Sequence, residues 1–415
     1  MSDSPEIKVD TTLGVTAPLG FKAGAAAVGV KKLSKKPDVG VIACDVAAAT
    51  AAVFTQNKVC AAPVLVCREH LARSRAIRGV VANSGNANAC TGEQGLADAR
   101  AMAATTAAKL GAPAEQFLVA STGVIGRMLP MDTVRLGVEN ACTALARGPE
   151  ADMAFARAIM TTDTRPKMAG ARLTLRGRTV TVAGCTKGVG MIAPNMATTL
   201  GFLTTDAPVA APVLDKILRR AADATYNCCT VDGHTSTNDT LILMASGLAF
   251  ADAAAKPISE RSAEGKQFAA AVMAVCESLA RQIVSDGEGA TKLIEIRVTG
   301  AASAAEARRA AGAIANSPLV KTAFFGQDPN WGRIVSAAGY AGISSGPETM
   351  RLIMGDLVIF DRGRPVDADA DRLAAVMKAH DIAVHLDLGA GSGAARYLTC
   401  DFSYDYVKIN AEYTT

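Results

Sequence analysis

Aromatic residues and histidine are scarce in this 415-residue sequence, which has 4% aromatic residues and four histidines. With so few aromatic rings, the core must be built from small apolar side chains packed closely together. The histidines stand apart, without the His-x-x-x-His or Glu-x-x-His spacing of metal ligands; they are His70, His234, His380 and His385. A zinc site is therefore not expected, and a Ser-His-Asp triad has few candidates for its base.

Charge of either sign is also limited. The 43 Lys and Arg residues against 39 Asp and Glu give a net charge of +4, too small for a general nucleic-acid binder. A solvated turn explains the one basic cluster, residues 31–36. Long apolar runs are missing as well, because Asp45 interrupts the longest candidate, residues 40–54, before it reaches the roughly 18 residues of a membrane helix. Neither nucleic acid nor membrane is expected as a partner.

The sequence has no secretory signal and no Cys-x-x-Cys motif. It begins Met1-Ser2-Asp3-Ser4-Pro5-Glu6, which is acidic and contains no apolar segment. Ten cysteines are scattered along the chain, and we expect them to be reduced, mostly buried thiols. These features predict a cytoplasmic protein.

What is present is a mixture of helical and strand patterns. Helices are expected where amphipathic spacing or N-terminal capping residues occur: 95–111, 133–147, 211–226, 259–284, 303–314 and 369–380. The first of these follows Thr91-Gly92-Glu93-Gln94, which has the form of a capping box. Strands are expected in β-branched or alternating runs: the hairpin 172–182, and 241–250, 293–298, 319–325, 352–360, 382–388 and 404–409. Because the two kinds do not alternate one for one, we predict an α+β fold of sheets with covering helices.

Two glycine-rich segments look like cofactor loops but are explained as turns. Residues 384–393 end in Gly389-x-Gly391-x-Gly393, similar to the cofactor loop of S-adenosylmethionine-dependent methyltransferases. Such a loop follows the first strand of its domain, and too little sequence remains after Gly393 to build the rest. Residues 286–292 lack the spacing of a Walker loop. A helix C-cap at Gly287 explains them, although Glu288, between two glycines, is well placed to face a ligand.

Residues 121–126 place a hydroxyl beside an unhindered backbone amide at a strand-to-turn transition. They read Ser121-Thr-Gly-Val-Ile-Gly126. The segment is either an ordinary glycine turn or an oxyanion hole made by the Thr122 hydroxyl and the Gly123 N–H.

The most informative segment is residues 187–202, where a Gly- and Pro-containing stretch changes abruptly to an apolar run. A threonine at the mouth of a buried strand is usually structural. The alternative is self-processing, in which Thr198 Oγ attacks the Ala197 carbonyl and the resulting ester hydrolyses. Thr198 then becomes a new N-terminus, whose α-amine, with a pKa of about 7.7–8.0, can be the base for its own hydroxyl. Such a site needs no histidine.

On these segments the sequence resembles the ornithine acetyltransferases, the glutamate N-acetyltransferases of arginine biosynthesis. The Lys-Gly-x-Gly-Met-Ile-x-Pro-Asn-Met-Ala-Thr block that ends at Thr198 is highly specific for this family. Other matching segments follow in family order: 81–95, 121–126, 160–164, 204–206, 230–239, 286–292, 328–333 and 401–410. The resemblance thus runs from near residue 14 to the C-terminus.

The resemblance implies a layered α/β/β/α sandwich, similar to the N-terminal-nucleophile arrangement, with a smaller C-terminal α/β subdomain roughly within 290–400. It implies self-cleavage between Ala197 and Thr198 into an α chain, 1–197, and a β chain, 198–415, which pair as α2β2. The implied reaction is ping-pong acetyl transfer. N2-acetyl-L-ornithine acetylates Thr198, L-ornithine leaves, and L-glutamate takes the acetyl group. Acetyl-CoA is a second donor in many members, and no cofactor or metal is implied.

The resemblance also implies roles for individual residues. Thr198 is the nucleophile, and Thr122 and Gly123 are the oxyanion pair. Substrate contacts are implied for Thr161, Lys187, Thr198, Glu288, Asn410 and Thr415. Lys187 can pair with an α-carboxylate, and Glu288 can hold the δ-ammonium of ornithine. The sequence departs from the family pattern at Thr199, where Met is more common, and at Thr414, where a basic residue is more common.

Two other functions remain open at the level of sequence. An N-terminal-nucleophile amidohydrolase or aminopeptidase would share the fold and the self-cleavage but transfer acyl groups to water. A non-enzymatic or cofactor-binding protein would depend on the 389–393 loop.

Overall fold

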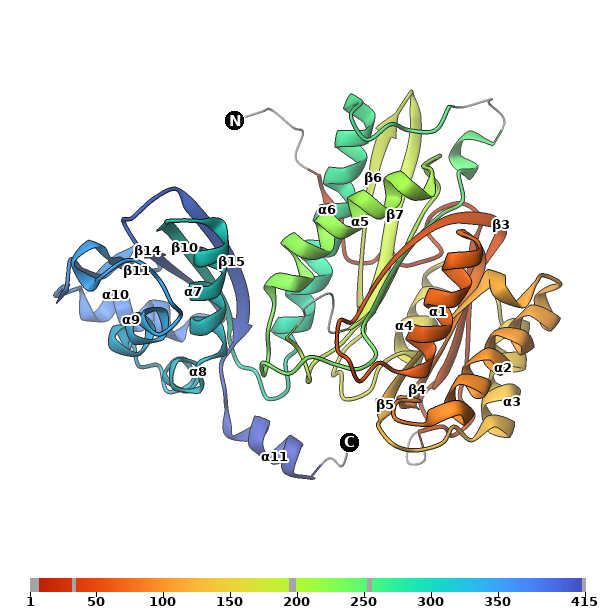
Figure 1. The fold of residues 1–415 in the computed structure, drawn as a ribbon, viewed down its shortest axis with the longest axis horizontal. Coiled ribbons are helices and arrows are strands. Elements are labelled where there is room, and N and C mark those ends of the chain that lie inside the picture. The colour runs from red at the N-terminus through yellow and green to blue at the C-terminus, as the bar shows by residue number, and fades with distance from the viewer. Residues whose placement is uncertain (1–6, 32–34, 194–198, 252–255, 413–415) are drawn as a thin grey trace.

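The computed structural model describes residues 7–31, 35–193, 199–251 and 256–412, which form a larger N-terminal body and a smaller C-terminal body (Figure 1). A mixed nine-stranded sheet runs through the larger body and a six-stranded sheet through the smaller one. The strands of the larger sheet are β1 Val9–Asp10, β2 Phe21–Ala26, β3 Val39–Phe54, β4 Ala76–Asn86, β5 Phe117–Val124, β6 Lys167–Leu175, β7 Arg178–Lys187, β8 Leu200–Thr205 and β9 Thr240–Ala245.

The 16-residue strand β3 joins two halves of the larger sheet. Its first part pairs with β2 and β4, and its last part, residues 49–54, pairs with β9. The register with β4 shifts between Ala43 and Ala48, an irregularity of the kind that bends a strand. The strand order is β1-β6-β7-β8-β9-β3-β4-β5, with β2 also paired to β3.

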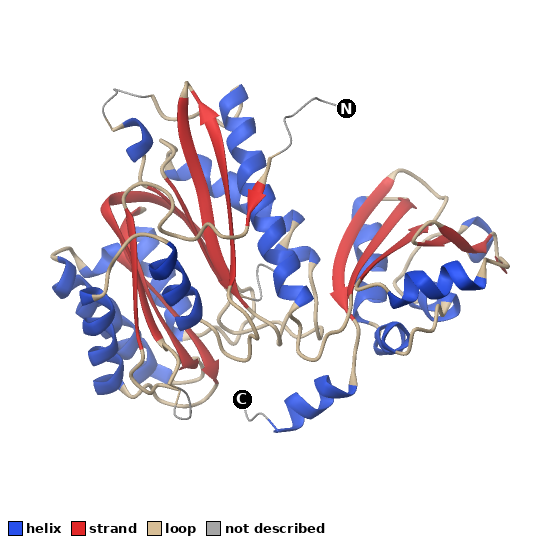
Figure 2. Cartoon of the chain, turned by 180° about the vertical axis from the view of Figure 1, so that it is seen from behind, coloured by secondary structure: helices blue, strands red, loops and turns tan. Residues whose placement is uncertain are grey.

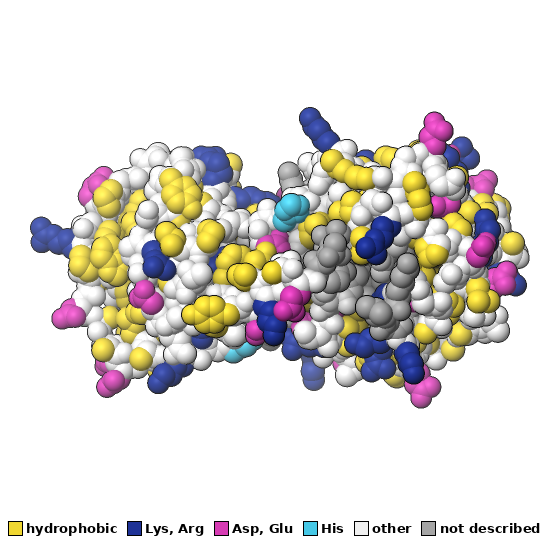
Figure 3. Space-filling model, turned by 90° about the horizontal axis from the view of Figure 1, so that it is seen from below, with side chains coloured by type: hydrophobic (Ala, Val, Ile, Leu, Met, Phe, Trp, Pro, Cys, Tyr) yellow, Lys and Arg dark blue, Asp and Glu magenta, His cyan; other side chains and the backbone are white. Residues whose placement is uncertain are grey.

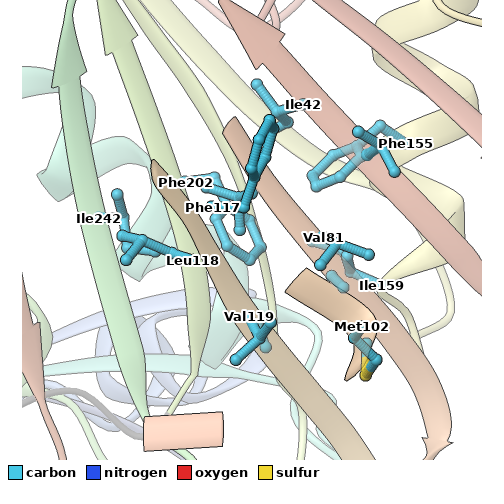
Figure 4. Close-up of a cluster of buried hydrophobic side chains, with 14 of the residues drawn as sticks. Ile42, Val81, Met102, Phe117, Leu118, Val119, Phe155, Ile159, Phe202 and Ile242 are labelled. Carbon is cyan, nitrogen blue, oxygen red and sulfur yellow. The ribbon is translucent and has the colours of Figure 1, made fainter. Parts of the chain in front are cut away.

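Side chains from both halves of the sheet share one core (Figure 4). Phe202 of β8 and Ile242 of β9 belong to the same buried cluster as Ile42 of β3 and Phe117 of β5. The other face of β6–β9 packs on α5 and α6 in a second cluster, while α1–α4 pack on β2–β5. This arrangement confirms the layered α+β fold. The helices of the larger body are α1 Ala62–Arg73, α2 Gly92–Leu110, α3 Met131–Thr143, α4 Pro149–Ala158, α5 Ala211–Ala224 and α6 Ala263–Ser285.

Small residues make the close packing possible, as the shortage of aromatic residues predicts. At Gly24 on β2, an added Cβ would lie 2.1 Å from the Ala141 carbonyl oxygen of α3. Helix and strand therefore approach more closely there than any side chain would allow. All ten cysteines lie within the described residues, and none of them is paired in a disulfide.

The smaller body contains the six-stranded sheet in the order β13-β12-β11-β14-β10-β15. Its strands are β10 Leu293–Ala301, β11 Arg351–Met354, β12 Leu357–Asp361, β13 Arg364–Pro365, β14 Asp381–Asp387 and β15 Gly393–Cys400. Its helices are α7 Ala304–Asn316, α8 Pro318–Phe325, α9 Trp331–Gly339 and α10 Ala370–Lys378. The last helix, α11 Tyr404–Glu412, leaves this body and runs back beneath the larger one, as both ribbon views show (Figures 1 and 2).

Most of the expected elements are confirmed, and two are wrong in type. The 172–182 hairpin forms with a two-residue turn in which Arg176 and Gly177 both have positive φ, as a type I′ turn requires. Residues 319–325 and 404–409, predicted as strands, are helical. In the first case the Ser317 side chain accepts the Val320 N–H and Pro318 takes the first helical turn. These start signals outweigh the apolar run that follows.

Two further expectations need correction. Thr91 does not close a capping box on α2, because its hydroxyl donates to Asn88 Oδ1 instead. Helix α6 is by length and composition apolar enough to cross a membrane, although no apolar run of that length was expected. Half of that apolar window is buried inside the fold, and the buried side chains pack against β6, β7 and α5. Burial of this kind is typical of a core helix.

The 389–393 loop is a turn between strands, as its position in the sequence predicts. It connects β14 to β15, which lie on opposite sides of β10, so the loop passes over the end of that strand. An added Cβ at Gly393 would lie 2.3 Å from the Ser303 carbonyl carbon. Glycine at this position therefore allows the backbone of the loop to pack closely against the backbone at Ser303.

Candidate active site

A cleft of about 250 Å³ opens where the ends of several strands of the larger sheet meet the turn after α6 and the helix α11. Six of the predicted site residues line it: Thr122, Gly123, Thr161, Lys187, Glu288 and Asn410. Ala197, Thr198 and Thr415 lie outside the described residues. Thr199 and Leu200, which follow Thr198 directly, also line the cleft. The structure thus brings together residues from segments that are far apart in the sequence, while their individual roles stay predictions.

Seen from below, the molecule has Lys and Arg side chains scattered among Asp and Glu (Figure 3). The described residues form no single basic stripe on this face, of the kind that follows a nucleic-acid backbone. Among the described residues, no group of three or more His, Cys, Asp or Glu side chains could hold a metal ion.

The backbone and side chain at the end of β5 fit the predicted oxyanion pair. Lys187 Nζ donates a hydrogen bond to Thr122 Oγ1 at 3.0 Å. A protonated ammonium can only donate, so the Thr122 oxygen accepts and its hydroxyl proton is left for another acceptor. Gly123 has a φ of 131°, and an added Cβ would lie 2.4 Å from the Gly85 carbonyl carbon. Only glycine fits this position.

Replacing Thr122 by valine should lower kcat about 10²- to 10³-fold, because the isosteric side chain removes one oxyanion donor. Steady-state kinetics of the purified variant measure this loss. Thr122→Ser keeps the hydroxyl and should retain most of the activity. A Thr122→Val enzyme with kcat within a few-fold of the unmodified protein would exclude the hydroxyl as an oxyanion donor.

The Glu288 carboxylate is held in place from two sides of the cleft. Thr162 Oγ1 donates to its Oε1 at 2.8 Å, and Asn410 Nδ2 donates to its Oε2 at 3.0 Å. An added Cβ at Gly190 would lie 2.4 Å from the same Oε2, so glycine is required opposite the carboxylate. A carboxylate has about four acceptor positions, which leaves capacity for a ligand cation.

A buried ion network lies behind the cleft. Lys167 is fully buried, and its Nζ lies 2.7 Å from Asp163 Oδ1 and 2.5 Å from Asp286 Oδ2. Asp163 also accepts the backbone N–H groups of Thr161 and Gly188. Asp286 accepts the N–H and the hydroxyl of Thr164. The network therefore ties together the segments that carry Thr161, Lys187 and Glu288.

The charges of this network act on the cleft. Burial lowers the pKa of the Lys187 ammonium; the charge of Asp163 opposes this shift and that of Lys167 adds to it. Burial by itself would raise the pKa of Asp163, but the charges of Lys167 and Lys187 outweigh it and the pKa is lowered. The structure therefore favours an ionised Asp163 beside Lys167.

The side chain of Thr199 has its own local explanation. Its hydroxyl lies 2.9 Å from the Thr186 hydroxyl on β7 and also donates to the Lys187 carbonyl oxygen. The family that the sequence resembles more often has Met at this position. Here the threonine hydroxyl is satisfied by hydrogen bonds to the neighbouring strand.

Sequence reasoning missed three residues of this region, Asp163, Lys167 and Asp239. Asp163 and Asp239 lie in segments 160–164 and 230–239, which carry the family resemblance but received no role. The four-residue spacing of Asp163 and Lys167 was the only signal for their contact. Nothing in the sequence pointed to the partner of Lys167 on the far side, Asp286.

The sequence is similar to known proteins along nearly its whole length. The sequence profile of the ArgJ family matches residues 22–415. The "Arginine biosynthesis bifunctional protein ArgJ" of Symbiobacterium thermophilum is 50% identical over 97% of this chain and 98% of its own length. The protein of the same name from Methylococcus capsulatus is 48% identical over the whole of both chains. The crystal structure of ornithine acetyltransferase complexed with ornithine from Mycobacterium tuberculosis is 39% identical. The aligned region covers 46% of this chain and 100% of the chain in that structure, and the TM-score is 0.44. The profile and the full-length relatives show that the chain belongs to the ArgJ family.

Proposed function

We propose that this chain transfers the acetyl group of N2-acetyl-L-ornithine to L-glutamate through an acetyl-Thr198 intermediate, producing L-ornithine and N-acetyl-L-glutamate. The observation that carries the proposal is the cleft, in which a potential oxyanion site, a lysine and a carboxylate face one cavity beside Thr199. The names of the full-length relatives, which are bifunctional proteins of arginine biosynthesis, support the same reaction.

The proposed cycle begins with self-cleavage between Ala197 and Thr198. The α-amine of Thr198 then takes the proton of its own hydroxyl, and Oγ attacks the acetyl carbonyl of the donor. The Thr122 hydroxyl and the Gly123 N–H stabilise the oxyanion. Lys187 pairs with the α-carboxylate of the substrate, and Glu288 holds the δ-ammonium of ornithine. After L-ornithine leaves, the amine of L-glutamate attacks the acetyl ester and releases Thr198.

We also propose acetyl-CoA as a second acetyl donor, association of the α and β chains as α2β2, and a cytoplasmic location. No cofactor enters the proposed cycle, because the acetyl group passes through the chain's own threonine. In this proposal Asn410 and Thr415 contact the substrate, so the C-terminal segment lies at the substrate site. The bond from Asn410 to Glu288 supports that placement.

The assay that tests the proposal supplies N2-acetyl-L-ornithine with and without L-glutamate and measures L-ornithine, N-acetyl-L-glutamate and free acetate. Transfer predicts N-acetyl-L-glutamate in step with L-ornithine, and little acetate. An amidohydrolase would instead release acetate at a rate that does not depend on L-glutamate, which would overturn the proposal. Replacing the donor by acetyl-CoA in the same assay tests the second activity.

The affinity for the donor should fall in alkaline solution. Lys187 binds the carboxylate only while protonated, and burial lowers its pKa from the usual 10.5. The KM for N2-acetyl-L-ornithine should therefore begin to rise at a lower pH than an ordinary lysine would give. In Lys187→Arg the guanidinium stays charged, so the KM should begin to rise only at a higher pH than in the unmodified protein. The titration of the substrate is common to both proteins, and identical pH profiles would contradict the role of Lys187.

A further inference from the structure

One carboxyl group in the cleft takes no part in the cycle above. Asp239 precedes β9 directly, is 2% exposed and lines the cleft. The Ser236 hydroxyl and the Thr199 backbone N–H lie close enough to its carboxyl group to lower its pKa. Its Oδ2 is buried and has no hydrogen-bond partner among the described residues. Buried polar atoms are rarely left in this state, so the exception requires an explanation.

Strand pairing fixes where this carboxyl group lies. β8 and β9 are parallel, with Leu200 opposite Thr240, and the Thr240 N–H donates to the Thr199 carbonyl oxygen at 2.8 Å. Asp239 is therefore beside Thr199. Thr199 follows Thr198 directly in the sequence. The carboxyl group thus lies beside the residue that directly follows the proposed nucleophile.

The two other carboxylates that line the described part of the cleft are already engaged. Both oxygens of Glu288 accept hydrogen bonds, from Thr162 and Asn410. Asp232 accepts the N–H groups of Met191 and Ile192 through its two oxygens. Among these three side chains, only Asp239 has a carboxyl oxygen without any hydrogen-bond partner in the described part of the chain.

The precursor needs such a group. Before cleavage the nitrogen of Thr198 is an amide, which cannot serve as the base that the α-amine becomes later. Attack of Oγ on the Ala197 carbonyl requires that the hydroxyl proton be removed. Breaking the C–N bond requires that the departing nitrogen receive a proton.

We propose that Asp239 is the proton relay of self-cleavage, an inference that rests on the self-cleavage in the proposed function. Its free oxygen takes the proton of Thr198 Oγ as Oγ bonds to the Ala197 carbonyl carbon. It returns that proton to the Thr198 nitrogen as the C–N bond breaks. Water then hydrolyses the ester to the Ala197 carboxylate and the Thr198 hydroxyl, and Asp239 is left unchanged.

The electrostatic surroundings of Asp239 suit this role. Burial raises its pKa well above the usual value, while the hydrogen bond from Ser236 and the charge of Lys187 act in the opposite direction. A carboxyl group with a raised pKa is a stronger base than an ordinary aspartate.

The test follows the full chain from synthesis to cleavage. Unmodified protein, Asp239→Asn, Asp206→Asn and Thr198→Ala are made by cell-free translation, and intact-mass spectrometry measures the fraction cut before Thr198 over time. Asp239→Asn should slow cleavage by about 10²-fold or more, the usual contribution of a proton-transfer group. Thr198→Ala is the uncut reference, and its thermal unfolding shows whether Asp239→Asn is folded.

Asp206 provides the matched control. Like Asp239, it is almost fully buried, with 3% of its surface exposed, and burial raises its pKa. It also lies next to the same pair of strands, because it directly follows β8 whereas Asp239 directly precedes β9. Its oxygens accept the N–H groups of Leu19 and Thr181, and it does not line the cleft. Asp206→Asn should therefore be cut at the unmodified rate. If Asp239→Asn does not fold, Asp239→Glu and Asp239→Gln replace it as a pair matched in size, and the Glu variant should be cut faster.

The outcomes separate the two proposals. Cleavage of Asp239→Asn at the unmodified rate overturns the relay while leaving the proposed function intact. Equal slowing in Asp239→Asn and Asp206→Asn also overturns it, because loss of any buried carboxylate would then suffice. An unmodified chain that is never cut before Thr198 defeats the self-cleavage itself, and the relay with it.

Discussion

Replacing Thr198 by alanine should leave a single uncut chain and abolish acetyl transfer. The hydroxyl of Thr198 is the proposed attacking group in two steps, self-cleavage and acetylation, and alanine has no atom that can replace it. The α-amine that would act as base is also never released. Removing the nucleophile of another covalent enzyme lowered kcat about 10⁶-fold, and we expect a loss of this order.

Denaturing electrophoresis and N-terminal sequencing measure the first effect, and the transfer assay measures the second. The unmodified protein should give two chains, one of which begins at Thr198. Thr198→Ser keeps a hydroxyl and should still be cut, more slowly, with measurable transfer. If Thr198→Ala still forms two chains, or still makes N-acetyl-L-glutamate at a comparable rate, Thr198 is not the nucleophile.

Replacing Lys167 by methionine should lower the free energy of unfolding by about 3–5 kcal/mol. Lys167 is the shared partner of Asp163 and Asp286 and is fully buried. Methionine fills a similar volume but leaves two buried carboxylates without a cation, and breaking a buried ion pair in this way is strongly destabilising. Urea unfolding of the two purified proteins at neutral pH measures the difference.

An exposed ion pair provides the control for this substitution. Lys22 lies 2.8 Å from Asp45, and both side chains are more than 40% exposed. Lys22→Met should change stability by less than about 1 kcal/mol, because exposed pairs contribute little. Similar effects of Lys22→Met and Lys167→Met would contradict the role assigned to the buried network.

The same network predicts a dependence of stability on pH. The pKa of Asp163 is lowered in the folded protein, so its ionised form stabilises the fold above the unfolded pKa of about 3.9. That contribution should be lost as the pH falls through the lowered pKa. In Lys167→Met the main charge that lowers this pKa is removed, and the acid-induced loss should begin at a higher pH.

Much of the fold can be predicted from local signals. Gly111, which has a positive φ of 63°, ends α2 where the sequence suggested, and Ser303 caps α7 through the Glu306 N–H. Residues 319–325 and 404–409 were predicted wrongly because short apolar or alternating runs do not distinguish strand from helix. The Ser-Pro start at 317–318 decides the first case. At α11, the aromatic rings of Phe402 and Tyr406 stack face to face, a contact that sequence spacing did not reveal.

Some residues of the candidate site could likewise be predicted from the sequence, and others could not. The specific sequence blocks named Thr122, Lys187, Glu288 and Asn410, which the structure brings into one cleft. The residues behind them could not be found, because their partners depend on tertiary folding. Lys167 contacts Asp286, 119 residues away, and Asp239 reaches Thr199 only through the parallel pairing of β8 and β9.

The central claim is that an acetyl group passes through Thr198, and one measurement tests it directly. The cleaved protein is incubated with N2-acetyl-L-ornithine alone, quenched in acid and analysed by intact-mass and peptide mass spectrometry. The account predicts one added acetyl group on the chain that begins at Thr198, located on that residue and lost when L-glutamate is supplied. Two results would contradict the account. One is a chain that carries no acetyl group while the enzyme is turning over. The other is an acetyl group on a different residue that L-glutamate removes as fast as the enzyme turns over.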